Sequence, residues 1–136
     1  MSDPSGTIRT LFDLVAAKDL AGVSELFAVD ATFTDAVGPT IVEGRPAITA
    51  MVAEMWEGLS DVHVEVRAMV SGDHTVMAEI ELVGTHDGPF LGCEPTGRAI
   101  RWPGAVRYEL SPSGDEIVAE SFFYDSVGLM AQLEQG

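Results

Sequence analysis

The sequence contains little cysteine and few basic residues. Its 136 residues include a single cysteine, Cys93, which excludes an intrachain disulfide and any metal site that needs two cysteine ligands. Lysine is equally scarce, so a Schiff-base mechanism would depend on Lys18 alone. Only 7 Lys and Arg residues stand against 22 Asp and Glu residues. The net charge of −15 disfavours nucleic acid or an anionic membrane as the main partner.

Long apolar runs and targeting signals are also missing. No stretch approaches the roughly 20 apolar residues of a membrane span, and the N-terminal residues lack the basic and apolar regions of a secretory signal. We therefore expect a soluble, cytoplasmic protein without a membrane partner. The histidines His63, His74 and His86 are spaced too widely for a compact metal motif, and no nucleotide-binding motif occurs. Neither a metal nor a cofactor is expected.

The first 59 residues have mostly helical periodicity. Apolar residues recur every three or four positions in three stretches, separated by a break at 18–19 and by a β-prone run over 31–35. Asp19 suits the N-cap of the second stretch, and Pro46 suits the first turn of the third. The apolar positions are Ile8, Leu11, Phe12 and Val15, then Leu20, Val23, Leu26 and Phe27, then Ile48, Met51, Val52, Met55, Trp56 and Leu59.

After residue 59 the hydrophobic period changes to the alternation that is typical of strands. We expect strands over 62–70, 76–84, 100–110 and 116–124, a loop over 87–97 and a closing helix over 126–135. The expected inner faces consist of Val62, Val64, Val66, Ala68 and Val70; of Val76, Ala78, Ile80, Leu82 and Gly84; of Ile100, Trp102, Val106, Tyr108 and Leu110; and of Ile117, Ala119, Ser121 and Phe123.

Helices followed by a meander of long strands indicate an α+β domain. We expect N-terminal helices packed on one face of a strongly curved, mostly antiparallel sheet, all within a single domain of residues 1–136. A cavity between the helices and the curved sheet would be a natural site for a ligand.

Three ionisable residues, Asp35, His86 and Asp125, share parity with the apolar face of the strand that each follows or ends. A charge in an apolar cavity is costly unless it is paired, protonated or functional, so these residues are candidates for proton transfer. Each also has a structural interpretation. Asp125 suits a helix N-cap, Asp35 suits a turn, and a single histidine often belongs to the core.

Aromatic residues on the expected inner faces are typical of the core when taken one by one, but together they could form a wall of the cavity. The candidates are Phe33, Trp56, Trp102 and Phe123. Such a wall favours a flat, apolar substrate.

Several segments resemble a known superfamily. Residues 27–35 (FAVDATFTD) and 43–48 (EGRPAI) resemble the pattern of nuclear-transport-factor-2-like proteins, which form a cone of helices on a curved sheet. Residues 84–92 (GTHDGPFLG), 95–98 (PTGR) and 124–133 (YDSVGLMAQL) are similar to the SnoaL-like polyketide cyclases of that superfamily. The resemblance covers essentially the whole chain, although the fold serves many unrelated functions.

The resemblance implies roles for two aspartates. Asp125 matches the acid/base aspartate of the cyclases, and Asp35 matches the general-base aspartate of the ketosteroid isomerases. Those isomerases also use a tyrosine on the first helix and a protonated acid on the third long strand. In this chain the position that matches the tyrosine holds Leu11, and the position that matches the protonated acid falls near Val106. The Asp–Arg–Asp relay of the epoxide hydrolases in this branch is not found at matching positions.

The favoured interpretation is an enzyme that performs an intramolecular aldol cyclisation, or a related proton transfer, on a small apolar, polyketide-like substrate. Asp125 would remove an α-proton, and His86 would orient Asp125 or donate a hydrogen bond to the enolate. One alternative moves the chemistry to Asp35, as in a ketosteroid-isomerase-like or epoxide-hydrolase-like enzyme. A second alternative is a non-catalytic protein that binds small molecules in the same cavity.

The resemblance also implies a homodimer. The outer face of the sheet is expected to be mostly charged, and Met69, Met77 and Val83 interrupt it.

Overall fold

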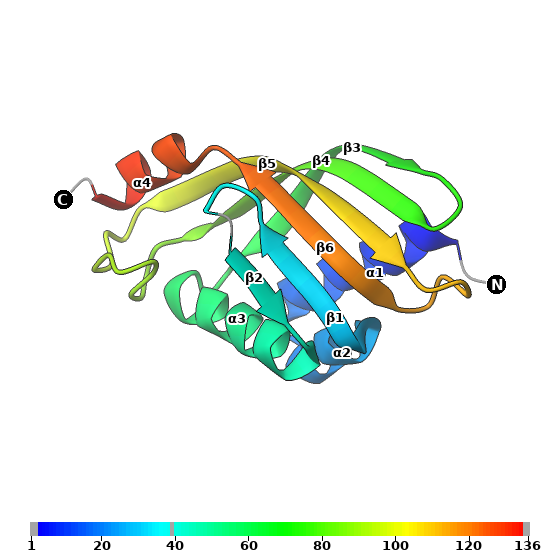
Figure 1. Cartoon of the computed structure of the whole chain (residues 1–136). Coiled ribbons are helices and arrows are strands. Elements are labelled where there is room, and N and C mark those ends of the chain that lie inside the picture. The colour runs from blue at the N-terminus through cyan, green and yellow to red at the C-terminus, as the bar shows by residue number, and fades with distance from the viewer. Residues whose placement is uncertain (1–2, 39, 135–136) are drawn as a thin grey trace.

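The computed structural model describes residues 3–38 and 40–134. Pro39 and Gln135, which belong to a predicted turn and to the predicted last helix, lie outside the described residues. The described elements run from helices to strands, with one helix inserted among the strands and one at the end (Figure 1). They are α1 (Pro4–Ala17), α2 (Leu20–Leu26), β1 (Phe27–Asp35), β2 (Thr40–Glu43), α3 (Arg45–Gly58), β3 (His63–Ser71), β4 (Thr75–Thr85), β5 (Ala99–Leu110), β6 (Ile117–Tyr124) and α4 (Ser126–Glu134).

The strands form one curved sheet in the order β2-β1-β6-β5-β4-β3. Its neighbouring strands are antiparallel except for the parallel pair β1 and β6. Helices α1 and α3 cover the inner face of the sheet, where α1 packs against β3 and β4 and α3 packs against β1. Helix α4 lies beside the first residues of β5 (Figure 1). The expectation of an α+β fold with N-terminal helices on a curved sheet is confirmed.

Local side chains determine where the helices begin. The Asp3 carboxylate accepts a hydrogen bond from the Ser5 amide at the start of α1, and Asp19 accepts one from the Gly22 amide at the start of α2. A proline lies in the first turn of α3, where no N–H donor is needed. The predictions for the starts of α2 and α3 are therefore confirmed. None of the helices in the described part of the chain is long and apolar enough to cross a membrane.

Two details of the first half differ from the prediction. Phe27 does not continue the helix but begins β1, where it pairs with Ile117 of β6. Strand β2 was not predicted, because its four residues lie at the edge of the sheet and are mostly exposed. An edge strand that pairs on one side needs no strong apolar alternation.

A bulge in β3 reverses the predicted faces of its second half. Arg67 is an extra residue opposite the step from Ile80 to Glu79, and it shifts the alternation by one position. Val70, predicted to face inward, is 67% exposed. Met69, predicted on the outer face, packs against the core instead.

A second bulge occurs in β6. Ile117 and Ala119 pair with consecutive residues of β5, which leaves Val118 as the extra residue. The predicted inner face is therefore wrong after Ile117, because Glu120, Phe122 and Tyr124 face inward. Strands β4 and β5 pair without a register shift, and their predicted inner faces are confirmed.

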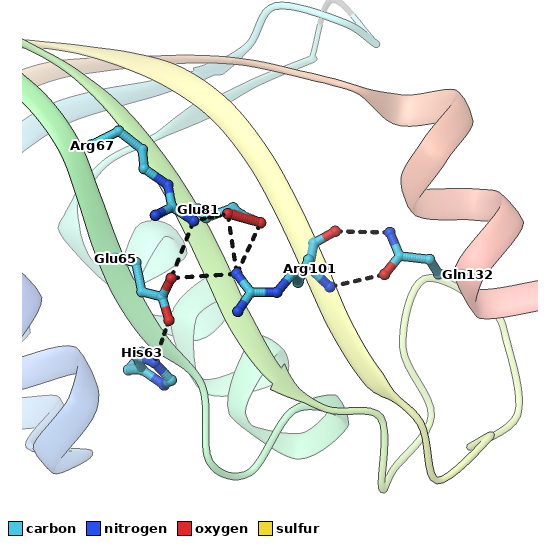
Figure 2. A network of polar contacts seen from close by, with 6 residues as sticks. All are labelled: His63, Glu65, Arg67, Glu81, Arg101 and Gln132. Atoms are coloured by element: carbon cyan, nitrogen blue, oxygen red, sulfur yellow. Dashed lines mark hydrogen bonds and ion pairs between the residues drawn. The ribbon is translucent and has the colours of Figure 1, made fainter.

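The outer face of the sheet carries a network of ion pairs (Figure 2). The Glu81 carboxylate contacts the guanidinium groups of Arg67 and Arg101, and Arg101 lies 3.3 Å from Glu65. The Gln132 amide of α4 makes two 2.8 Å hydrogen bonds to the backbone N–H and C=O of Arg101. Helix α4 thus satisfies the backbone of β5 where β6 has ended.

Candidate active site

A cavity of about 550 Å³ lies between the helices α1 and α3 and the inner face of the sheet. Most of its lining is apolar, with side chains from both helices and from five of the strands. The polar lining residues are Asp35, Glu54, Glu57, Tyr108, Glu120 and Tyr124. A mostly apolar cavity with a few convergent polar groups is the usual form of a small-molecule site.

Asp35 lies at the end of β1 and lines the cavity, as its parity predicted. Its Oδ2 accepts a 2.7 Å hydrogen bond from the Tyr124 hydroxyl, and its Oδ1 accepts hydrogen bonds from the amides of Val37 and Gly38. A carboxylate has about four lone-pair positions, so one remains open for another donor. Burial and the bond to Asp35 raise the pKa of Tyr124 to about 12. The tyrosine therefore stays a hydrogen-bond donor at neutral pH.

Glu120 is the second carboxyl group of the cavity. It projects from the inner face of β6, where it pairs in register with Tyr108 of β5 and Phe33 of β1. Burial raises its pKa from 4.5 to about 8, although a hydrogen bond with Tyr108 acts in the opposite direction. Tyr108 itself is buried, which raises its pKa well above 10.0. At neutral pH Glu120 therefore holds a proton in this apolar environment.

The two carboxyl groups lie on neighbouring strands of the same face. In the parallel β1–β6 pair, Phe33 is opposite Glu120 and Asp35 is opposite Phe122. Asp35 is thus two residues along the strand from Glu120, which puts the two Cα atoms about 8 Å apart. Their surroundings differ, because Asp35 accepts three hydrogen bonds while Glu120 is desolvated. Two carboxyl groups in such different environments can serve as base and acid.

The mouth of the cavity lies beside the second half of α3 and the loop after β4. Glu54 and Glu57 of α3 line the cavity and are exposed, and Leu91 of the loop is 54% exposed. The loop passes so close to α3 that a Cβ at Gly88 would lie 1.9 Å from the Glu57 carbonyl oxygen. Only glycine fits at that position.

Two of the four predicted wall residues line the cavity. Phe33 and Trp102 are in the lining, whereas Trp56 is not, because it packs into the core on the flank of α3. Phe123 is 53% exposed on the outer face, on the other side of the β6 strand from the cavity. The predictions that Trp56 and Phe123 line the pocket are wrong.

Asp125 does not face the cavity. It is exposed, and its Oδ1 accepts a 2.9 Å hydrogen bond from the Gly128 amide at the start of α4. It also lines a shallow depression on the outer face together with Phe123. The prediction that Asp125 lies on the apolar face is wrong because of the bulge at Val118. The N-cap interpretation is confirmed.

His86 is fully buried, as its parity predicted, but it lies behind the cavity lining. Its Nδ1 is 3.1 Å from the Thr96 hydroxyl and accepts a hydrogen bond from the Thr96 amide, while its Nε2 has no hydrogen-bond partner among the described residues. Its backbone N–H donates a hydrogen bond to the Arg98 carbonyl, and its carbonyl accepts one from the Gly97 amide. His86 therefore ties together the two ends of the loop that forms the mouth, and it does not meet Asp35 or Asp125 in one site.

The sequence analysis missed Glu120 and Tyr124 as polar residues of the site. Alternation counted from Ile117 across the bulge puts Glu120 on the outer face, which is why the parity argument does not single it out. Counting back from the aromatic residues Phe122 and Tyr124 would have placed Glu120 inside. Tyr108 was predicted on the inner face, but only as part of its apolar surface.

A metal centre is not indicated in the described residues. Within 3–38 and 40–134, no group of three or more His, Cys, Asp and Glu side chains could hold a metal ion. The cluster around the cavity consists of carboxyl and phenol groups, whose chemistry is proton transfer.

Comparisons with known proteins agree with the fold. The family model described as a SnoaL-like domain matches residues 8–120. A SnoaL-like polyketide cyclase, so named provisionally, from Jannaschia sp. is 23% identical, with a TM-score of 0.86, covering 98% of this chain and 92% of that one. IdmH of Streptomyces antibioticus, which is also named provisionally as a polyketide cyclase, is 24% identical, with a TM-score of 0.83. The match covers 98% of this chain and 100% of IdmH.

A third similar structure is the epoxide hydrolase/cyclase-like enzyme SalBIII, which is described as acting in pyran ring formation in the polyether salinomycin. It is 20% identical, with a TM-score of 0.78 and coverage of 92% of both chains. A comparison with curated proteins gave no match.

Proposed function

The chain belongs to the SnoaL-like family, and from this premise we propose that it is an acid–base enzyme of the cyclase or isomerase type. Its substrate is a small, apolar, polyketide-like molecule with a proton next to a carbonyl group. The observation that carries the proposal is the pair of carboxyl groups, Asp35 and Glu120, that share one apolar cavity in different environments. IdmH and SalBIII, named for cyclisation chemistry, have the same fold.

Asp35 acts as the base. As a carboxylate it takes the α-proton of the substrate through its open lone pair, and the C–H electron pair moves into an enolate. Tyr124 and the amides of Val37 and Gly38 hold the carboxylate in place through their hydrogen bonds. The apolar side chains around Asp35 keep these donors preorganised, which favours catalysis.

Glu120 acts as the acid. In a cyclisation, the enolate carbon attacks a second carbonyl of the same molecule, a C–C bond forms, and the carbonyl oxygen takes the proton of Glu120. The product has the same atoms as the substrate. Asp35 has gained one proton and Glu120 has lost one, so the return of a proton from Asp35 to Glu120 restores the enzyme. The raised pKa of Glu120, about 8, suits an acid at neutral pH. The apolar wall brings the reacting carbons together.

The assignment is tested by hydrogen–deuterium exchange at the α-carbon of 1-tetralone, a fused-ring ketone that fits an apolar cavity. We expect the wild-type protein to accelerate exchange measured by NMR, Asp35→Asn to abolish the acceleration and Glu120→Gln to lower it. Tyr124→Phe, which removes one donor to Asp35, should have a smaller effect. A folded Asp35→Asn variant with the wild-type rate would overturn the role of Asp35.

Non-catalytic binding in the same cavity is the second candidate. It is favoured by the fact that each carboxyl group already bonds a tyrosine of the chain, Asp35 with Tyr124 and Glu120 with Tyr108. If the wild-type protein binds 1-tetralone and related ketones without accelerating exchange, this candidate replaces the enzymatic one.

We further propose that the protein forms a homodimer through the outer face of its sheet. The hydrophobic residues Val70, Met77 and Phe123 are exposed there beside the ion pairs. Light scattering that finds only the 14.5 kDa monomer would refute this proposal.

A further inference from the structure

The cavity is acidic and has no basic side chain in its lining. Of the residues that line it in the described chain, Asp35, Glu54, Glu57 and Glu120 are acids, and none is Lys, Arg or His. Glu54 and Glu57 are exposed at the mouth, about one helical turn apart on α3, so both are accessible to an entering ligand. A ligand with a carboxylate, sulfonate or phosphate group would be repelled on entry and would find no counter-charge inside.

Aromatic rings form one continuous wall of the same cavity. Trp102 contacts three other rings, with centroid distances of 5.6 Å to Phe90, 5.5 Å to Phe122 and 5.5 Å to Tyr124. All four residues line the cavity. The faces of such rings carry partial negative charge and attract cations, with tryptophan the strongest.

We propose that the ligand of this cavity is an apolar molecule that carries a positively charged ammonium group. The ammonium group lies between the carboxylates of Glu54 and Glu57 and the aromatic wall around Trp102, and the apolar body extends toward Tyr108. This proposal deepens the proposed function, on which it rests for treating the ligand as a substrate. Asp35 stays available as the base, because the mouth carboxylates provide the counter-charge.

The geometry favours a substituted ammonium group over a primary one. Alkyl groups on nitrogen spread the charge over a larger surface and weaken its hydration, so transfer into an apolar cavity costs less. The cation then gains contacts with the ring faces and the attraction of the two glutamates at the mouth. A neutral molecule of the same shape gains only the apolar contacts.

Three probes of almost equal shape test the charge preference. They are phenyltrimethylammonium, its neutral isostere tert-butylbenzene and the anion benzenesulfonate. Binding is followed by NMR through the indole signals, because Trp102 lines the cavity and Trp56 lies outside it. We expect phenyltrimethylammonium to bind at least tenfold more tightly than tert-butylbenzene, or about 1.4 kcal/mol. Benzenesulfonate should leave the Trp102 signal unchanged.

A matched pair of double variants separates the mouth from the overall charge of the chain. Glu54→Gln with Glu57→Gln removes two charges at the mouth, and Glu25→Gln with Glu79→Gln removes two exposed charges outside the cavity lining. The first pair should reduce the preference for the cation several-fold, and the second should leave it nearly unchanged. A preference that is absent in the wild-type protein, or equal in both double variants, overturns the proposal, as does failure of all three probes to bind.

The result is independent of catalysis. If phenyltrimethylammonium binds as expected while Asp35→Asn retains the exchange activity of the wild type, the proposed base is wrong and the ammonium site stands. If exchange depends on Asp35 but the neutral probe binds as well as the cation, the ammonium site is wrong and the proposed base stands.

Discussion

Replacing Glu120 with Gln should make the fold less sensitive to alkaline pH. Burial raises the pKa of Glu120 from 4.5 to about 8, so between these values the folded chain keeps a proton that the unfolded chain has released. In that window the free energy of unfolding falls by about 1.4 kcal/mol per pH unit as pH rises. The loss across the whole window is at most about 5 kcal/mol, because part of the carboxyl surface meets the cavity.

Urea denaturation at pH 5, 6, 7, 8 and 9 measures this effect. The stability of Glu120→Gln relative to the wild type should rise with pH and level off above about 8. The lowered pKa values of Asp61 and Asp87 do not interfere, since their contribution is lost only at acidic pH. The exposed Glu79→Gln variant should show a constant difference from wild type. If the Glu120→Gln and wild-type curves run parallel from pH 5 to 9, the carboxyl group is not desolvated as described.

Three further substitutions test other parts of the structure. Asp125→Ala should cost about 1 kcal/mol of stability through the lost N-cap of α4 and leave 1-tetralone exchange unchanged; a loss of exchange in the folded variant would return the chemistry to Asp125. In thermal melts, Gly88→Ala should destabilise the fold by more than about 2 kcal/mol, whereas Gly72→Ala, with no atom within 4 Å of the new Cβ, should be nearly neutral; equal melting temperatures would contradict the tight loop contact. Arg101→Gln should lower the free energy of unfolding at pH 7, because Glu81 loses a partner that lowers its pKa. The loss of stability should become smaller as pH falls below 4.5 or as the salt concentration rises. A loss that depends on neither pH nor salt would point to lost packing instead.

Much of the fold could be predicted because its elements carry regular local patterns. The apolar stripe of α3, the N-cap Asp19, the first-turn position of Pro46 and the alternation of β4 and β5 all correspond to the structure. These patterns depend on neighbours within a few residues, which the sequence contains directly. The single parallel pair, β1 with β6, and the edge strand β2 depend on contacts between distant segments.

The candidate site was predicted only in part. Asp35 was placed correctly because nothing interrupts the alternation of β1 between Ala31 and the end of the strand. Asp125 was assigned to the wrong face and Glu120 was missed, because the bulge at Val118 shifts the alternation between the start of β6 and these residues. The bulge at Arg67 has the same effect in β3, where it exchanges the predicted faces of Met69 and Val70.

The sequence by itself determined the helices, the long strands, the strong negative charge and the presence of an apolar face with acidic residues near it. Only the tertiary structure decided which acid lies inside, since a strand keeps its period of two only while its pairing with the neighbouring strand is regular. The bulge arises where β5 and β6 meet, so its position depends on two segments that pack together and not on either one alone. Glu120 beside Tyr108, with Asp35 two residues along the next strand, exists only once that pairing has formed.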